Sequence, residues 1–342
     1  MAAVTESETG EREPSLAQKW LYVLATTNPP KGRLDPISKW LYLTRAGVFP
    51  MTIVSAALAG LLAVYRDDEV NWAWFSLAAA GILLAHMANN LMNDLFDVAV
   101  GTDREDYPRN LYSPHPVLSG VITKRGLGLL ALAVNTICLA IMIGLTIARD
   151  WWIVAFAVGG FVLSAAYTAP PLRLKKRGLG EPTVVVVWGP LMVGGCYYAA
   201  TGTAPAAVML ASMPYAILCT TVLMGKHIDK APWDAADGTR TLPVILGDVR
   251  ARRVTQGMFV AFYALVAVLV ALQVLPIGTL LVALSWPMLR QVWTAYDAPK
   301  PDVSPVPNPV WPLWFAPHSF LLTRRAGGLF TLGLVAGAVL GV

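Results

Sequence analysis

The feature that most constrains this chain is a series of long apolar stretches that carry almost no charge. Of its 342 residues, 56% are hydrophobic and 14% are charged, whereas a soluble globular protein has about 25% charged residues. Uncharged runs of about 18 or more residues are typical of membrane-spanning helices. We place nine runs at 47–65, 72–92, 127–148, 151–169, 182–201, 206–225, 255–275, 276–294 and 327–342. The sequence therefore predicts an all-α, polytopic membrane protein with nine transmembrane helices.

The basic residues are distributed asymmetrically between the segments that connect these runs. With a cytoplasmic N-terminus, 24 of the 26 lysines and arginines fall on the cytoplasmic side, and only Arg66 and Arg149 lie outside. Cytoplasmic loops of membrane proteins carry this excess of Lys and Arg. We therefore expect an integral protein of the cell membrane with its N-terminus in the cytoplasm and its C-terminus on the opposite side.

The chain divides into an N-terminal extension, residues 1–39, and a single membrane domain, residues 40–342. The first 15 residues have the composition of a disordered segment. Residues 16–28 fit a short helix that lies on the membrane surface. The proline-rich segment 295–317 predicts an extended linker. Three cysteines lie within predicted spans, at spacings that indicate neither a metal site nor a disulfide framework: Cys138, Cys196 and Cys219.

An acidic stretch, ANNLMNDLFDVAVGTDRED, ends the second apolar run. Asn90, Asp94 and Asp97 follow helical spacing and share one face, with Asn93 beside them, and Asp103 comes after the helical stretch. Carboxylates this close repel each other, and a bound cation removes the conflict. Oxygen ligands without His or Cys favour Mg²⁺, whose remaining positions are filled by water and phosphate oxygens. The alternative is an ordinary solvated helix end.

A second acidic stretch, GKHIDKAPWDAADGTRTLPVILG, follows the sixth run and is predicted to be a cytoplasmic loop. Two acidic clusters that face one compartment can hold two or three Mg²⁺ ions and clamp a diphosphate, while basic side chains bind the remaining phosphate oxygens. The alternative is again a solvated loop. The candidate metal ligands and the interleaved basic residues are Asp229, Asp234, Asp237, Lys226, Lys230 and Arg240.

A third stretch, YTAPPLRLKKRGLGEP, begins at the end of the fourth run. Its two prolines break the helix after Tyr167, and Arg173 and Lys175 begin a basic cluster beyond them. An anchor for anionic lipid would explain the basic residues but not Tyr167.

Together these stretches resemble the UbiA superfamily of membrane prenyltransferases. The first acidic motif of that family reads N-D-x-x-D with a later Asp, and here it is Asn93-Asp94-x-x-Asp97 with Asp103. The form NDxFDxxxGTD is most similar to the menaquinone branch, which attaches a polyprenyl chain to 1,4-dihydroxy-2-naphthoate. The stretches YTAPPLRLKKRGLGEP, VVWGPLMVGGCYYAATG and GTRTLPVILG are also similar to that branch. LTRAGVFP is similar to the entry to the family's first helix, and it contains Arg45.

The resemblance implies nine helices around a central cavity that opens sideways to lipid. It implies Mg²⁺ ligation by Asp94, Asp97 and Asp234, supported by Asn90 and Asn93. It places Tyr167 near the reacting carbon. The diphosphate-binding residues that it implies are Arg45, Arg109, Lys124, Arg173 and Lys175.

The second acidic motif departs from the family pattern, which usually reads D-x-x-x-D. Here Asp229 and Asp234 are one residue further apart, and Lys230 stands where the first aspartate would align. Counted back from Thr241, only Asp234 keeps the family position, so that Asp229 or Asp237 would have to supply the other carboxylate.

The expected activity is Mg²⁺-dependent transfer of a polyprenyl group from an allylic diphosphate to an aromatic acceptor, here 1,4-dihydroxy-2-naphthoate. The expected catalytic residues are Asp94, Asp97, Asp234 and Tyr167. The expected partners are the prenyl diphosphate, a small acceptor and membrane lipid, with no nucleic acid, at a site that faces the cytoplasm. A terpene cyclase and transfer to a non-aromatic acceptor remain alternatives. A transporter fits less well, because transporters usually place ionisable groups near the bilayer midplane.

Overall fold

The structure is a computed structural model, and it describes residues 14–66, 69–99 and 109–340. Over these residues every regular element is a helix and no strand forms, which confirms the predicted all-α class. Six continuous helices are long and apolar enough to cross a membrane: Ala46–Tyr65, Trp72–Ala99, Lys124–Ala148, Gly180–Thr201, Ala206–Ala236 and Asp248–Ala271.

Each predicted apolar run overlaps one of the long helical rods. In chain order these are α3 (Phe49–Tyr65), α4 (Trp72–Ala99), α6 (Lys124–Ala148), α7 (Trp152–Thr168), α8 (Gly180–Val186) continued by η3 (Val187–Leu191) and α9 (Met192–Thr201), α10 (Ala206–Ala236), α12 (Asp248–Ala271), η4 (Ile277–Ser285) continued by α13 (Trp286–Asp297), and α14 (Phe315–Leu340). The short helices are α1 (Leu16–Thr26), α2 (Pro36–Leu43), η1 (Ala46–Val48), α5 (Arg109–Tyr112), η2 (Leu174–Arg177) and α11 (Leu242–Leu246).

Two helix boundaries differ most from the sequence prediction. α14 begins at Phe315 and not near residue 327, so that Arg324 and Arg325 lie inside a helix of 26 residues. α10 continues to Ala236 and therefore carries most of the second acidic stretch, which was predicted to be a loop. Both acidic stretches thus begin on the ends of long helices.

Local sequence explains how several helices begin. Ser15 and Gln18 form a capping box at α1, and the Asp35 carboxylate accepts backbone hydrogen bonds at α2. At α2 the pKa of Asp35 falls to about 2, chiefly because the hydroxyl of Ser38 donates to its carboxylate. The hydroxyl of Thr123 accepts from the Gly126 amide, 3.0 Å away, at the start of α6.

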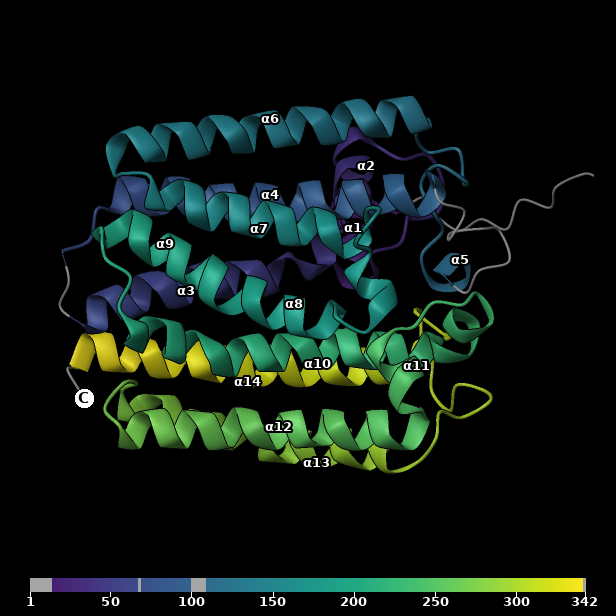
Figure 1. Cartoon of the computed structure of the whole chain (residues 1–342). Coiled ribbons are helices and arrows are strands. Elements are labelled where there is room, and N and C mark those ends of the chain that lie inside the picture. The colour runs from purple at the N-terminus through teal and green to yellow at the C-terminus, as the bar shows by residue number, and fades with distance from the viewer. Residues whose placement is uncertain (1–13, 67–68, 100–108, 341–342) are drawn as a thin grey trace, which may run out of the picture.

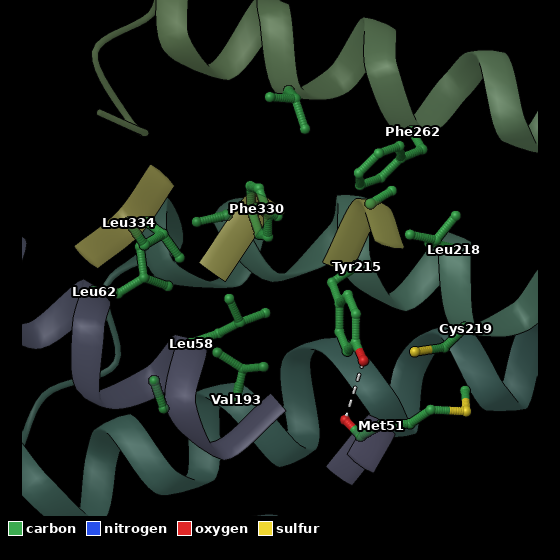
Figure 2. Packing of buried hydrophobic residues seen from close by; sticks show 14 of the residues in the cluster. Met51, Leu58, Leu62, Val193, Tyr215, Leu218, Cys219, Phe262, Phe330 and Leu334 are labelled. Atoms are coloured by element: carbon green, nitrogen blue, oxygen red, sulfur yellow. Dashed lines mark hydrogen bonds between the residues drawn. The ribbon is translucent and has the colours of Figure 1, made fainter. Parts of the chain in front are cut away.

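The main hydrophobic core lies between α3, α9, α10, α12 and α14, and Figure 2 shows part of it. Leu58, Phe262 and Phe330 are completely buried there. The Tyr215 hydroxyl donates to the Met51 carbonyl at 3.4 Å and so joins α10 to α3, the contact drawn as a dashed line in Figure 2. All three cysteines are free, as predicted.

α14 and η4 approach so closely that only glycine fits between them. A Cβ built on Gly333 would lie 2.3 Å from the carbonyl oxygen of Gly278 and 2.5 Å from the Cα of Thr279. Real Cβ atoms do not approach backbone atoms this closely, so this pair of glycines sets the distance between the two rods.

The helix ends that carry the polar motifs lie together. In Figure 1 the short elements α1, α2, α5 and α11 gather at one end of the bundle, beside the C-terminal ends of α4 and α10 and the start of α8. The opposite end, which α14 reaches with its last turns, carries none of these elements. The candidate site is therefore built at one end of an apolar bundle.

Candidate functional site

The end of α4 presents its carboxylates to two basic side chains. The Arg45 guanidinium donates to Oδ1 of Asp94, whose side chain is 1% exposed. Arg45 is the residue before η1, and its backbone is in the left-handed conformation, with a φ of +55°. One turn further along α4, Lys175 Nζ lies 3.0 and 3.1 Å from the two carboxylate oxygens of Asp97. The predicted metal ligands Asp94 and Asp97 are therefore each paired with a predicted diphosphate-binding residue from another segment.

The two asparagines of the first motif bind neighbouring elements. The Asn90 amide donates to the Thr44 carbonyl at 2.8 Å, and the Asn93 carbonyl accepts from the Thr168 hydroxyl at 2.5 Å. These contacts fix α4 against the segment that carries Arg45 and against the end of α7. They support the site by orienting its helices.

The second acidic stretch separates into two faces of α10. Asp234 is buried and lies 3.9 Å from the ammonium of Lys230, one turn earlier. Asp229 faces the other way, and its two carboxylate oxygens accept the backbone amides of Phe315 and Ala316, each at 3.0 Å. Asp237, the C-cap residue of α10, is exposed.

Asp229 thus holds the start of α14, a contact that sequence reasoning did not foresee. Lys300 strengthens the same junction, because its ammonium donates to the carbonyls of Asp229 and Pro312, both at 3.2 Å. Burial lowers the pKa of Lys300, although Asp229 opposes this shift. The proline-rich segment is therefore held against the end of α10 by specific contacts. Because both carboxylate oxygens of Asp229 bind this junction, we leave it out of the metal ligands proposed below.

Tyr167 lies between the two acidic helix ends. Its side chain is half-buried at the end of α7, and it interacts electrostatically with Arg45, Asp97, Asp234 and Glu181. A Cβ on Gly180 would lie 3.1 Å from the Tyr167 ring, so the absence of a side chain there lets the ring rest on the start of α8. One aromatic side chain is therefore surrounded by groups from both acidic stretches and from the third, basic stretch.

The basic stretch packs against α7, the helix that carries this tyrosine. Backbone contact between the Arg240 amide and the Lys176 carbonyl, at 3.3 Å, joins η2 to the segment before α11. Burial, followed by the neighbouring Lys175 ammonium, lowers the pKa of Lys176, while Asp97 and Asp237 partly oppose this shift. Arg173 adopts a φ of +44°, and its Nε is buried with no hydrogen-bond partner among the described residues.

The remaining predicted residues differ in how exposed they are. Lys226 is half-buried on α10, one turn before Lys230, whereas Lys124 and Arg240 are exposed. Asp103 lies outside the described residues, and so does the side chain of Arg109.

Sequence reasoning missed a buried pair beside Tyr167. Glu181 and His227 are 3% and 2% exposed, and Oε1 of the glutamate lies 2.7 Å from Nδ1 of the histidine. The pair joins the start of α8 to α10. Neither residue belongs to a recognisable spacing, because the two positions are 46 residues apart in the chain. Glu181 lies in the third stretch and His227 in the second acidic stretch, but neither stretch by itself indicates their contact.

The donors available at this centre suit a metal that arrives together with a phosphate. Over the described residues no three His, Cys, Asp or Glu side chains converge to form a complete metal cage. Mg²⁺ commonly binds through one or two carboxylates and completes its shell with phosphate oxygens and water. Asp94, Asp97 and Asp234 are hard oxygen donors on helix ends and fit that mode of binding.

Comparison with known proteins identifies a family. The model of the UbiA prenyltransferase family matches residues 53–304. The chain is 28% identical over 261 residues to 2-carboxy-1,4-naphthoquinone phytyltransferase of Synechocystis sp., covering 74% of this chain and 80% of the relative. It is 30% identical over 223 residues to 1,4-dihydroxy-2-naphthoate octaprenyltransferase of Escherichia coli, covering 63% and 70% of the two chains.

The fold is also similar to a solved structure. The structure of a UbiA homolog from Archaeoglobus fulgidus bound to GPP and Mg²⁺ superposes with a TM-score of 0.55 at 18% identity, covering 86% of this chain and 99% of that one. At this identity the similarity concerns the fold.

Proposed function

The chain belongs to the UbiA prenyltransferase family, and from this membership and the geometry around Tyr167 we propose the reaction that it catalyses. It is an enzyme that transfers a polyprenyl group from an allylic prenyl diphosphate to an aromatic acceptor in a Mg²⁺-dependent reaction. The acceptor we propose is 1,4-dihydroxy-2-naphthoate. The observation that carries this proposal is the position of Tyr167, which interacts with Asp97 on α4, Asp234 on α10 and the basic side chain of Arg45.

The basic side chains would bind the diphosphate headgroup. Arg45 and Lys175 now pair with Asp94 and Asp97, so these two carboxylates and two cations already balance each other. The diphosphate oxygens would bind Arg45 and Lys175, and Asp94 and Asp97 would then be available to hold Mg²⁺. Arg173, with its buried Nε, adds a further donor on the same side. Mg²⁺ held by Asp94, Asp97 and Asp234 would neutralise the negative charge that develops on the leaving diphosphate.

The reacting carbon would lie against Tyr167. When the allylic C–O bond breaks, the diphosphate leaves with the electron pair and the prenyl carbon becomes cationic. An aromatic face stabilises such a cation by about 2 kcal/mol when water is excluded. An electron-rich ring carbon of the acceptor then supplies the electron pair of the new C–C bond, and carbon dioxide or a proton leaves the ring to restore aromaticity.

An aromatic layer lies deeper in the bundle, on the same face of α4. The His86 ring contacts Phe49 and Trp188 edge to face, with ring centroids 5.5 and 5.2 Å apart. The Thr52 hydroxyl lies 2.7 Å from Nδ1 of His86. A prenyl chain whose headgroup is bound at Asp94 would pass this layer towards the apolar core, where water cannot reach the cation.

The naphthoate acceptor is supported by the relatives, both of which are named for naphthalene-derived acceptors. The membrane arrangement that we propose has nine crossings, a cytoplasmic N-terminus and a site that faces the cytoplasm in the cell membrane. It is supported by the excess of basic residues near the site and by the position of the end of α14 away from it. Residues 1–39 then form an extension whose α1 exposes Leu16, Leu21 and Leu24, as expected for contact with a membrane surface.

The proposal is tested by product analysis of the purified protein. We expect that geranylgeranyl diphosphate, 1,4-dihydroxy-2-naphthoate and Mg²⁺ together give a prenylated naphthoquinol precursor and free diphosphate, and that EDTA abolishes both. A hydrocarbon formed without any acceptor would instead show a cyclase, and diphosphate release with no naphthoate product across several prenyl chain lengths would reject the acceptor.

A further inference from the structure

We infer that Glu181 binds a hydroxyl group of the aromatic acceptor and that His227 positions Glu181 for this task. This inference rests on the proposed function, since it assigns a role at the same site to residues outside the diphosphate-binding set. Glu181 is almost completely buried, at 3% exposure, in the first turn of α8. A carboxylate in such a position must be matched by hydrogen-bond donors, because burying it without them is costly.

Among the residues that the structure describes, only one of the two carboxylate oxygens has a hydrogen-bond partner. Oε1 lies 2.7 Å from Nδ1 of His227. Oε2 is buried as well and has no hydrogen-bond partner among the residues that the structure describes. With Glu181 ionised, both of its oxygens only accept hydrogen bonds, so the tautomer of His227 that fits this contact has its proton on Nδ1 and donates a hydrogen bond to Oε1. Oε2 is thus left as an acceptor site that a ligand can fill.

The position of Glu181 indicates which part of the substrates it meets. The preceding residue, Gly180, supports the Tyr167 ring, so Glu181 lies beside the tyrosine that we place against the reacting carbon. The diphosphate would avoid a buried carboxylate of like charge and would bind the Arg45 and Lys175 side. A neutral hydroxyl donor of the second substrate is attracted instead.

The acceptor provides such a donor in one place. In 1,4-dihydroxy-2-naphthoate the 1-hydroxyl lies beside the carboxylate and hydrogen bonds to it internally, so the 4-hydroxyl is free to donate. We assign this 4-hydroxyl to Oε2 of Glu181. The contact would orient the ring in front of the prenyl carbon and would reject naphthoates that lack the group, because the buried oxygen would then stay unmatched.

The first test compares acceptor and donor kinetics in Glu181→Gln. The amide keeps the size of the side chain but replaces the charged acceptor, so we expect the KM for dihydroxynaphthoate to rise about 10- to 100-fold. The KM for the prenyl diphosphate and the Mg²⁺ concentration for half-maximal rate should change less than about threefold. The matched control is Glu69→Gln, the same change at an exposed residue before α4, which should leave all three values unchanged.

The second test removes the hydroxyl instead of the carboxylate. The 4-deoxy compound, 1-hydroxy-2-naphthoate, lacks only this hydroxyl. Used as a competitive inhibitor of the wild type, it should bind about 10- to 100-fold more weakly than dihydroxynaphthoate does. In Glu181→Gln this penalty should nearly vanish, since the two changes remove the same interaction. Equal penalties in both proteins would overturn the assignment of the hydroxyl.

The third test examines His227 as a positioning residue. His227→Asn retains a donor near the place of Nδ1 and should keep the acceptor KM within about threefold of the wild type, whereas His227→Leu should raise it as Glu181→Gln does.

If Glu181→Gln raised the Mg²⁺ requirement or the prenyl diphosphate KM and not the acceptor KM, Glu181 would belong to the metal or diphosphate site and the inference would be wrong. If wild-type protein fails to prenylate dihydroxynaphthoate at all, the proposed function fails before the variants are compared.

Discussion

At the scale of single residues, the second acidic stretch shows how helical geometry separates carboxylates that are close in sequence. Five residues turn an α-helix by about 500°, which places Asp229 and Asp234 about 140° apart around α10. Asp234 consequently interacts electrostatically with Tyr167, whereas Asp229 binds backbone amides at the start of α14. Lys230 precedes Asp234 by one turn and lies on its side of the helix, which explains their ion pair.

Burial predicts different results for Asp234, which is buried, and Asp237, which is exposed. Asp234→Asn removes a charge from the diphosphate site that we propose, so we expect kcat to fall about 10²- to 10³-fold with little change in thermal stability. Asp237→Asn, an exposed position three residues later, should change kcat by less than about threefold. The rate of diphosphate release gives kcat for both variants, and an equal loss of kcat in the two would contradict the assignment of Asp234.

At the scale of the elements, Asp229 acts as the cap of α14 from another helix. Two buried backbone amides depend on its carboxylate, and Gly225, one turn earlier on α10, allows the close approach because a Cβ there would lie 2.7 Å from the Ala316 nitrogen. Helix termini need such partners for their first amides.

Removal of this cap should therefore destabilise the protein without changing its chemistry. We expect Asp229→Ala to lower the free energy of unfolding by about 1–2 kcal/mol, seen as a lower melting temperature in detergent. The Mg²⁺ dependence of the remaining activity should match the wild type. Asp302→Ala, an exposed residue of the proline-rich segment, is the control and should melt like the wild type. A normal melting temperature for Asp229→Ala, together with an altered Mg²⁺ requirement, would return Asp229 to the metal site.

The contact between α14 and η4 gives a second prediction at this scale. Gly333→Ala forces a methyl group against the backbone of Gly278 and Thr279, and we expect a loss of about 1–3 kcal/mol in unfolding free energy. Gly328→Ala lies in the same helix with open space around its Cβ position, so it should be neutral or slightly stabilising. Thermal unfolding of the two variants compares them directly, and an equal effect in both would show that the close approach does not limit packing.

The sequence was sufficient to predict most of these elements but not their polar ends. Uncharged runs identify the rods because a bilayer excludes charge over a fixed thickness. The start of α14 escaped this reasoning because Arg324 and Arg325 interrupt its apolar character. The acidic end of α10 was expected to be a loop for the same reason, although its helix continues to Ala236.

At the scale of the whole molecule, one end of an apolar bundle collects polar groups that are far apart in the chain. Residues from segments near 45, 94, 175, 181 and 234 surround Tyr167. The acidic stretches indicated Asp94 and Asp234 and the basic cluster indicated Lys175, whereas Arg45 followed from the resemblance to the family. The partnership of Glu181 with His227 could not be predicted, since it depends on how α8 and α10 pack and on no spacing within either.

We propose that α4 and α10 together form a single metal–diphosphate site, and metal binding tests this proposal most directly. Mn²⁺ can replace Mg²⁺ as a paramagnetic probe, and its binding can be followed by electron paramagnetic resonance with a non-hydrolysable prenyl thiodiphosphate. We predict tight Mn²⁺ binding to the wild type only when the diphosphate analogue is present, and its loss in both Asp94→Asn and Asp234→Asn. Unchanged binding in either variant would contradict the account, because the two helix ends would then not share the site.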